Sequence, residues 1–287
     1  AAPPPGLRSA SAPIMPAVAK HGVLGLSDVL RAELVKVVRR RVLMITAAAV
    51  VVFAIGGAAI VLMTAEPAAT VIPGRGPTVE ALAQAGGGTQ VFLTTASFTG
   101  FFVFVIFVGA FAIEFGRGTI RTMLLRQPRR LKLLAGKMSG LLVFAAGVLA
   151  VTEAVTWVAA RLIAPSQDIA TDGWVSLAGL GAGIVDFGAV LLWVTGYAVL
   201  GMTIAVLVRS VPVAFAVGIA WAGPIEHLLQ DAWGSASSLF PGLLLEAFVA
   251  GGTPEVTAPR AALTLVLYVG AAALIAGMSF ARRAVTA

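Results

Sequence analysis

Six apolar runs dominate the pattern of hydrophobic and polar positions along this chain. Crossing the roughly 30 Å hydrocarbon core of a bilayer takes about 20 apolar residues in a helix that rises about 1.5 Å per residue. Backbone polar groups cannot stay unsatisfied in lipid, so such runs are predicted to be helices. The predicted spans are Val42–Thr64, Val91–Ile113, Met138–Ala160, Ile184–Val208, Val211–Ile225 and Ala261–Ala281. The pattern therefore predicts an all-α membrane protein with six transmembrane helices.

Composition agrees with this class. The chain is 59% hydrophobic and 11% charged, with a mean hydropathy of +0.98, which an ordinary soluble domain does not reach. It contains no cysteine, which excludes disulfides and Cys-ligated metals, and its two histidines, His21 and His227, are too far apart to form a metal site. Residues 1–24 are predicted to be a mobile cytoplasmic tail, and residues 25–287 a single transmembrane domain.

The segment Ser27–Arg41 has a different pattern, that of a surface helix. Its apolar side chains, Leu30, Leu34, Val37 and Val38, share one helical face, and the charged side chains, Glu33 among them, fill the remainder. Ser27 is the predicted N-terminal cap. The pattern predicts a helix along the inner membrane surface, with its basic face toward lipid head groups or a protein partner. A plain positive anchor for the first span is compatible with the same pattern.

Positive charge is distributed unevenly between the two sides of the six spans. Seventeen of the twenty Lys and Arg residues fall on the side of the two termini, which leaves Arg75, Arg161 and Arg260 on the other side. Loops rich in Lys and Arg stay in the cytoplasm. Both termini are therefore predicted to be cytoplasmic. The net charge of +7 follows from this topology, and nucleic-acid binding is not expected.

Two regions outside the spans are singled out by their length and charge. The segment Glu114–Lys137 holds seven Lys and Arg residues and predicts a short amphipathic helix that ends before Pro128, suited to contact with a cytosolic partner. On the other side, His227–Trp233 and Leu239–Val249 are too short to cross a bilayer. They predict either a re-entrant gate or a pair of interfacial helices.

Two carboxylates fall inside predicted spans. Glu153 lies about 22 Å into the third span at 1.5 Å per residue, and Asp186 lies near the outer start of the fourth. Charged groups at such depths usually face a cavity or a partner. Two roles for these carboxylates are open. One is a structural polar contact, for which Arg161 is a candidate partner of Glu153, and the other is binding of a cationic substrate.

The order of these elements resembles that of the permease subunit of bacterial type 2 ATP-binding-cassette exporters, which export drugs, lipids and polysaccharides. The resemblance covers about residues 25–283. It is sharpest at Glu114, Gly118–Arg121, Leu124–Leu125, Pro128, Arg129–Arg130 and Gly136–Lys137. It implies that Ser27–Arg41 is the connecting helix, that Thr119–Gln127 is the coupling helix seated in a groove of an ATPase, and that Glu226–Thr257 is an external re-entrant hairpin.

The resemblance also implies partners. Two permease chains, identical or paralogous, would assemble with two ATPase subunits in the plasma membrane of a bacterium, in contact with membrane lipid. ATP and magnesium would bind to the ATPase, and this chain would bind no cofactor and would not be an enzyme itself. The residues implied to couple it to the ATPase are Glu114, Thr119, Ile120, Arg121, Met123, Leu124, Arg126 and Arg129. Among them, the apolar Ile120, Met123 and Leu124 would be buried in the partner's groove.

A substrate path is the last implication of the resemblance. The second span borders the central path in the resembled family, and the cargo would be a lipophilic or amphipathic drug or lipid. The implied path residues are Thr95, Phe98, Thr99, Phe104, Phe107, Phe111 and Glu153. Aromatic side chains that pack against lipid or other helices explain the phenylalanine stripe equally simply.

Other classes are weighed by their motifs. The chain lacks G-x-x-x-x-G-K-[ST]. Gly136–Lys137 is followed by Met138 and has no glycine at the upstream position that the motif requires, so the chain has no phosphate-binding loop of its own. It also lacks G-x-S-x-G and H-E-x-x-H, which argues against an intramembrane enzyme. The alternative is an ion-coupled secondary transporter or channel that uses Glu153 and Asp186. The absence of a predicted midplane helix break argues against it.

Overall fold

The computed structural model describes residues 25–69, 77–126, 128–221, 225–233 and 235–282. Within these ranges the side chains of residues 97–103, 126, 231 and 237 are not among those described. The predicted tail, residues 1–24, and Gln127 of the predicted coupling helix lie outside the described residues. Within the described ranges the chain is mostly helical and forms no β-strand, and a single antiparallel bridge pairs Gly252 with Thr257.

The all-helical fold is confirmed for the described residues, and its long apolar helices agree with a membrane protein. Four helical segments are long and apolar enough to cross a bilayer: Arg40–Met63 (α2), Arg130–Gln167 (which contains α6, Arg130–Ile163), Leu177–Val208 (α7) and Ala258–Arg282 (α11). Two more helices overlap the remaining two predicted spans, for which crossing of a bilayer stays a prediction. They are α4 (Gly87–Gly116), with 30 residues, and the shorter α8 (Val211–Ala220).

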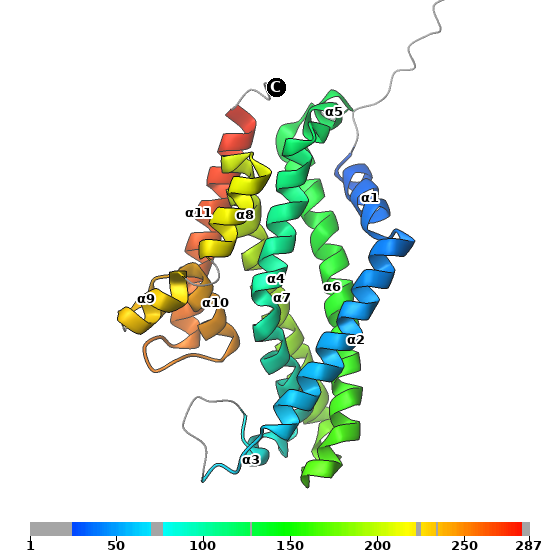
Figure 1. The fold of residues 1–287 in the computed structure, drawn as a ribbon, viewed down its shortest axis with the longest axis vertical. Helices are drawn as coiled ribbons and strands as arrows, with labels where there is room; N and C mark the ends of the chain where they lie inside the picture. Colours follow the sequence, from blue (N-terminus) through cyan, green and yellow to red (C-terminus); the bar gives the residue numbers. More distant parts are fainter. Residues whose placement is uncertain (1–24, 70–76, 127, 222–224, 234, 283–287) are drawn as a thin grey trace, which may run out of the picture.

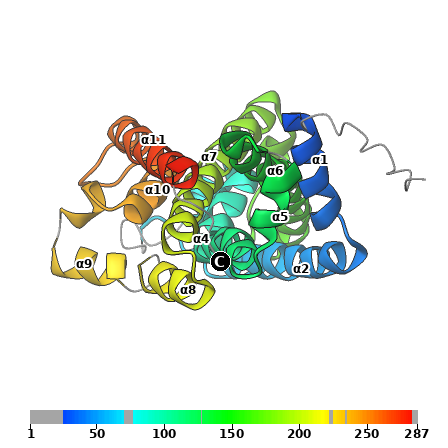
Figure 2. The same cartoon turned by 90° about the horizontal axis from the view of Figure 1, so that it is seen from above.

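The helices form two groups. Figure 1 shows α2, α4, α6 and α7 extending along the long axis of the molecule, and Figure 2 shows α8 to α11 gathered beside α4 and α7. Helices α4 and α7 cross closely, since a Cβ on Gly201 would lie only 3.1 Å from the backbone nitrogen of Val108. The hydroxyl of Thr203 donates to the carbonyl of Ala272 at 3.1 Å and so joins α7 to α11. Helix α7 is therefore the central element that connects both groups.

Helix α1 (Leu26–Val37) lies against α6. Figure 1 shows it toward the end of the bundle that also holds α5 (Thr119–Arg126) and the C-terminal end of α11. The prediction that Ser27 caps this helix is wrong. The cap is Gly25, whose backbone nitrogen donates to the Asp28 carboxylate at 2.7 Å. The predicted polar face is also wrong in one position, because Glu33 is buried, together with Val29, against α6.

The turn between α4 and α5 depends on glycine. Gly118 has φ +67°, a conformation that residues with a Cβ rarely adopt, and α5 begins at the next residue. The helix ends close to Pro128, as the sequence predicts, since a proline disfavours the helical conformation of the residue before it.

The opposite end of the bundle has its own small core. Helix α3 (Val79–Leu82) and the short 3₁₀ turns η1 (Ala164–Gln167) and η2 (Asp172–Val175) pack there. Trp174 is buried at the centre, and its indole N–H donates to the carbonyl of Leu82 at 2.9 Å. This contact joins α3 to the α6–α7 connection and so fixes where α7 begins relative to α6.

Both predicted short helices are present, as α9 (Glu226–Ala232) and α10 (Pro241–Val249), with the 3₁₀ turn η4 (Ala236–Ser238) between them. In Figure 1 they lie beside the middle of the bundle, below α8. Glu226 is buried and accepts a hydrogen bond from the backbone nitrogen of Leu243 at 3.0 Å, in the first turn of α10. Its carboxylate thus satisfies an orphan N–H at the positive end of that helix.

Candidate functional site

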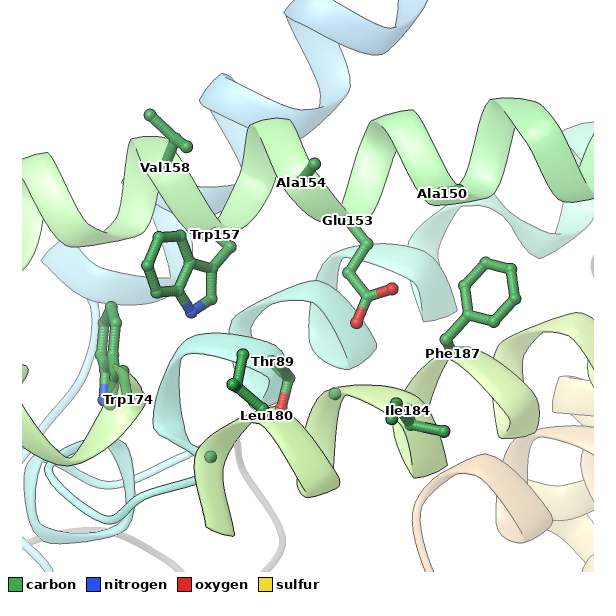
Figure 3. Close-up of a pocket in the computed structure, with 12 residues that line it drawn as sticks. Thr89, Ala150, Glu153, Ala154, Trp157, Val158, Trp174, Leu180, Ile184 and Phe187 are labelled. Carbon is green, nitrogen blue, oxygen red and sulfur yellow. The ribbon is translucent and has the colours of Figure 1, made fainter. Parts of the chain in front are cut away.

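A groove between α6 and α7 contains one of the two intramembrane carboxylates. Its volume is about 490 Å³, and Figure 3 shows Glu153 extending from α6 toward α7 within it. The lining is aromatic and aliphatic apart from Glu153 and Thr89, with Trp157, Trp174 and Phe187 as its large side chains. The sequence predicted a cavity or a partner for Glu153, and the structure places it in a cavity.

The second carboxylate lies at the edge of the same groove. Asp186 accepts a hydrogen bond from the hydroxyl of Thr89, a groove-lining residue, at 2.6 Å. A Cβ on Gly183, one helical turn before Asp186, would lie 3.4 Å from Oε1 of Glu153 and 3.2 Å from Cγ2 of Thr89. Because Gly183 has no side chain, it leaves room for the side chains of Glu153 and Thr89, and Asp186 is bonded to Thr89.

Among the described residues, Glu153 has neither a hydrogen bond nor an ion pair. The candidate pairing with Arg161 is wrong. The guanidinium of Arg161 instead lies over the ring of Trp157, 5.4 Å from its centroid. A carboxylate with no partner in a groove at membrane depth is unusual, because charged groups there ordinarily pair with another charge or with backbone groups.

The aromatic stripe of α4 is part of the protein core. Phe107 and Phe111 are buried among other side chains of the chain, and Thr95 is buried beside Gly57 of α2, with its hydroxyl bonded to the carbonyl of Val91. In this structure these three residues pack against other helices of the chain, and their assignment to a substrate path stays a prediction. Phe104 borders only a small cavity of about 120 Å³. The side chains of Phe98 and Thr99 lie outside the described residues.

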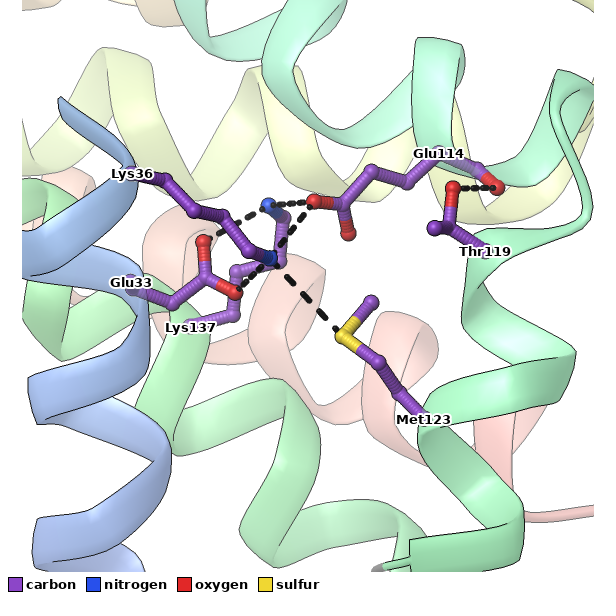
Figure 4. Close-up of polar contacts among 6 residues, drawn as sticks. All are labelled: Glu33, Lys36, Glu114, Thr119, Met123 and Lys137. Atoms are coloured by element: carbon purple, nitrogen blue, oxygen red, sulfur yellow. Dashed lines mark hydrogen bonds and ion pairs between the residues drawn. The ribbon is translucent and has the colours of Figure 1, made fainter. Parts of the chain in front are cut away.

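A cluster of four charges joins α1, α4 and α6 (Figure 4), with two of its side chains buried, one nearly so and one partly exposed. We call Glu33, Lys36, Glu114 and Lys137 the charge cluster. Lys36 lies 2.6 Å from Glu33 and 3.2 Å from Glu114, and Lys137 lies 3.3 Å from Glu33 and 3.0 Å from Glu114. Each ammonium therefore touches both carboxylates, and the four charges sum to zero.

The charge cluster lies next to the predicted coupling helix, α5. The sulfur of Met123 in α5 lies 3.9 Å from the ammonium of Lys36, and Thr119 donates to the backbone carbonyl of Glu114 at 3.4 Å. Burial alone lowers the pKa of Lys36, but its hydrogen bond to Glu33 and the charge of Glu114 outweigh that effect and raise the pKa above its ordinary value. Lys36 therefore stays charged.

Two glycines make room for α1 at this point. A Cβ on Gly136 would lie 2.7 Å from Cβ of Val29, and one on Gly140 would lie 2.7 Å from Cβ of Glu33. Glycines four residues apart on one helix face allow another helix to approach closely. The pair Gly136 and Gly140 thus forms a notch that brings Glu33 within reach of Lys137.

The helix α5 is buried by the chain itself on one side and exposed on the other. Ile120 is 3% exposed and belongs to the core, and Met123 and Leu124 are half-buried against it. The chain itself already buries Ile120, and burial of this side chain in a partner's groove stays a prediction. Leu125, which is 84% exposed, and Arg121 are among the side chains of α5 that are open to a partner. The side chain of Arg126 lies outside the described residues.

Sequence analysis missed three members of the charge cluster. It assigned Glu33 and Lys36 to the charged face of the surface helix, toward lipid head groups or a partner, and regarded Lys137 as part of a basic loop. The signal in the sequence was the G-K-x-x-G run at Gly136–Gly140, in which a lysine lies between two small residues at helical spacing. Such a run marks a helix–helix contact that buries a charge.

Neither the models of known protein families nor the curated proteins include a match to this chain.

Proposed function

We propose that this chain is the permease subunit of an ATP-binding-cassette exporter and is driven by ATP hydrolysis on a separate ATPase subunit. The observation that carries the proposal is the charge cluster under α5. A surface helix (α1), the short basic helix (α5) and the ends of two long helices (α4 and α6) meet there in one contact. Force applied to α5 has a route into the long helices through these contacts.

The resemblance in sequence supports the same role. Its sharpest residues include Glu114, the Gly118–Arg121 run and Lys137, and two of these belong to the charge cluster. An exposed apolar side chain and an exposed cation on the same short helix, Leu125 and Arg121, suit a groove with acidic edges on a partner. By this proposal α5 is cytoplasmic, and two copies of the chain, or this chain and a paralogue, enclose the path for a lipophilic or amphipathic cargo.

The test uses the exposed face of α5, because the buried face is needed for folding. The full chain is purified from native membranes, and co-purifying proteins are identified by mass spectrometry, with an ABC ATPase as the expected partner. The variant Arg121→Glu/Leu125→Asp should lose that partner and the ATP-dependent transport while it melts like the wild type. The control is Arg260→Glu, which changes an exposed charge on the side of the membrane opposite the two predicted cytoplasmic termini. This variant should retain both the ATPase and the ATP-dependent transport. Retention of the ATPase by the α5 variant would contradict the proposal.

A second candidate function has one observation in its favour. The groove brings Glu153 and Asp186 together through Thr89, and paired carboxylates at membrane depth are the groups that an ion-coupled transporter uses. Transport that survives ATP depletion and collapses with the proton gradient would establish that candidate.

A further inference from the structure

The groove between α6 and α7 has the chemistry of a binding site for an organic cation. It contains one carboxylate, Glu153, that has no protein partner among the described residues, and it borders a second, Asp186, whose Oδ2 accepts a hydrogen bond from the groove-lining Thr89. Aromatic faces attract cations, most strongly at tryptophan, and Trp157 and Phe187 flank Glu153 in Figure 3. Neither aromatic rings nor carboxylates alone would select a cation with an apolar body, but together they do.

The two carboxylates lie at the same level in the bundle. Glu153 precedes the end of α6 at Ile163 by ten residues, and Asp186 follows the start of α7 at Leu177 by nine residues, so each is roughly 14–15 Å from the same end at 1.5 Å per residue. Helices α6 and α7 are consecutive and joined by η1 and η2 at that end. A cation between them would contact both helices at once.

The surroundings of the groove suit an apolar body. Its mouth is lined by Val158, Leu180 and Ile184, all exposed on the surface of the bundle at membrane depth. A second groove of about 420 Å³ shares Ala154 and Val158 with it and is lined by apolar side chains alone. An apolar group attached to a cationic head has a continuous apolar surface over α6 on which to lie.

We infer that the groove between α6 and α7 binds a lipophilic organic cation, with its charge between Glu153 and Asp186 and its apolar body against Trp157 and Phe187. The cation supplies the counter-charge that Glu153 lacks among the described residues. As a cargo site, this inference rests on the proposed export function and narrows the cargo to cations. As a binding site, it requires neither an ATPase nor transport.

The decisive experiment compares two probes of the same shape and opposite charge. Binding of tetraphenylphosphonium and of tetraphenylborate to the purified full chain in detergent micelles is measured by equilibrium dialysis, with empty micelles subtracted. Tetraphenylphosphonium should bind saturably at one site, and tetraphenylborate should bind at least about tenfold more weakly, since the carboxylates repel it. Equal binding of the two probes would overturn the inference.

Variants locate the site. Glu153→Gln should weaken tetraphenylphosphonium binding about tenfold or more, Asp186→Asn should weaken it less because Thr89 already holds that carboxylate, and the exposed control Glu66→Gln should leave it unchanged. Should Glu153→Gln fail to fold, Ala154→Phe decides the matter, because it fills the groove from an exposed position and keeps both carboxylates. Unchanged cation binding in Ala154→Phe, or in a folded Glu153→Gln, would overturn the inference.

The proposed function can fail separately. If no ATPase co-purifies but tetraphenylphosphonium binding depends on Glu153, the cation site stands and the exporter proposal falls. If an ATPase co-purifies and drives transport but tetraphenylphosphonium binding is unaffected by Glu153→Gln, the exporter proposal stands and the cation site falls.

Discussion

Glu33 of α1 and Lys137 of α6 form an ion pair inside the protein, with 3.3 Å between the carboxylate and the ammonium and side chains that are only 3% and 4% exposed. The desolvation of two such charges largely offsets their attraction, so the pair adds little net stability. The pair instead specifies how the helices are arranged. With Lys36 and Glu114 it fixes one arrangement of α1, α4 and α6 at the end of the bundle where α5 lies.

Removal of a single charge from the cluster should be strongly destabilising. Lys137→Ala leaves Glu33 and Glu114 with one ammonium between them, and an uncompensated buried charge costs about 3–5 kcal/mol. The double variant Glu33→Leu/Lys137→Met keeps the cluster neutral and should recover much of that loss. Thermal unfolding of the detergent-solubilised protein measures both. The control Lys132→Ala changes an exposed lysine on the same helix and should melt like the wild type, and the same melting temperature for Lys137→Ala would refute the prediction.

The glycine notch should not tolerate a side chain. A methyl group at position 140 would lie 2.7 Å from Cβ of Glu33 and 3.2 Å from the carbonyl oxygen of Leu30, so Gly140→Ala must push α1 away from α6. Overpacking of this kind costs about 1–3 kcal/mol. Gly147→Ala is the matched control on the same helix, because no atom lies within 4 Å of its Cβ position. Equal stability of the two variants would show that α1 does not need this close approach.

The stability of the α9–α10 region should depend on pH through Glu226. Burial raises the pKa of this carboxyl above its ordinary value of 4.5, against the lowering effect of the hydrogen bonds from Leu243, Trp221 and Gly242. A carboxyl with a raised pKa in the folded state contributes stability that is complete below the ordinary pKa and is lost as pH rises through the folded pKa. The melting temperature should therefore fall as pH rises above about 4.5.

Glu226→Gln isolates this effect. Its amide can still accept from the backbone nitrogen of Leu243 but does not ionise, so the part of the pH dependence due to Glu226 should disappear. Glu246, whose pKa is also raised by burial, titrates in both proteins, and its charge contributes to the raised pKa of Glu226. The exposed control Glu66→Gln should keep the wild-type pH profile. Identical profiles for wild type and Glu226→Gln would rule out this titration.

The predicted topology can be tested without a background of native thiols, because the chain has no cysteine. Leu125→Cys and Leu177→Cys place single thiols at highly exposed positions at the two ends of the bundle. A membrane-impermeant maleimide added to intact cells should label Leu177→Cys at once and Leu125→Cys only after permeabilisation, because the Lys/Arg-rich side stays in the cytoplasm. The reverse labelling pattern would invert the topology and end the proposed contact between α5 and a cytosolic ATPase.

Much of the fold follows from local properties of the sequence. Apolar runs specify the long helices because transfer into a bilayer depends on the sum of local side-chain contributions. Gly118 and Pro128 specify the limits of α5 because their backbone restrictions are local too. The observed helices extend beyond the predicted spans at most ends, since polar residues such as Arg130 and Lys137 continue a helix out of the apolar core.

Tertiary structure alone decided which polar residues meet. A helical wheel places Glu33 with the solvated charges of α1, and only the notch at Gly136 and Gly140 rotates it toward Lys137. Likewise, Glu153 and Asp186 are 33 positions apart, and they share a groove because the η1–η2 connection sets the register of α6 against α7. Hydropathy accumulates residue by residue and can be summed along a chain, whereas the pairing of charges depends on helix rotation and register, which only the packed structure defines.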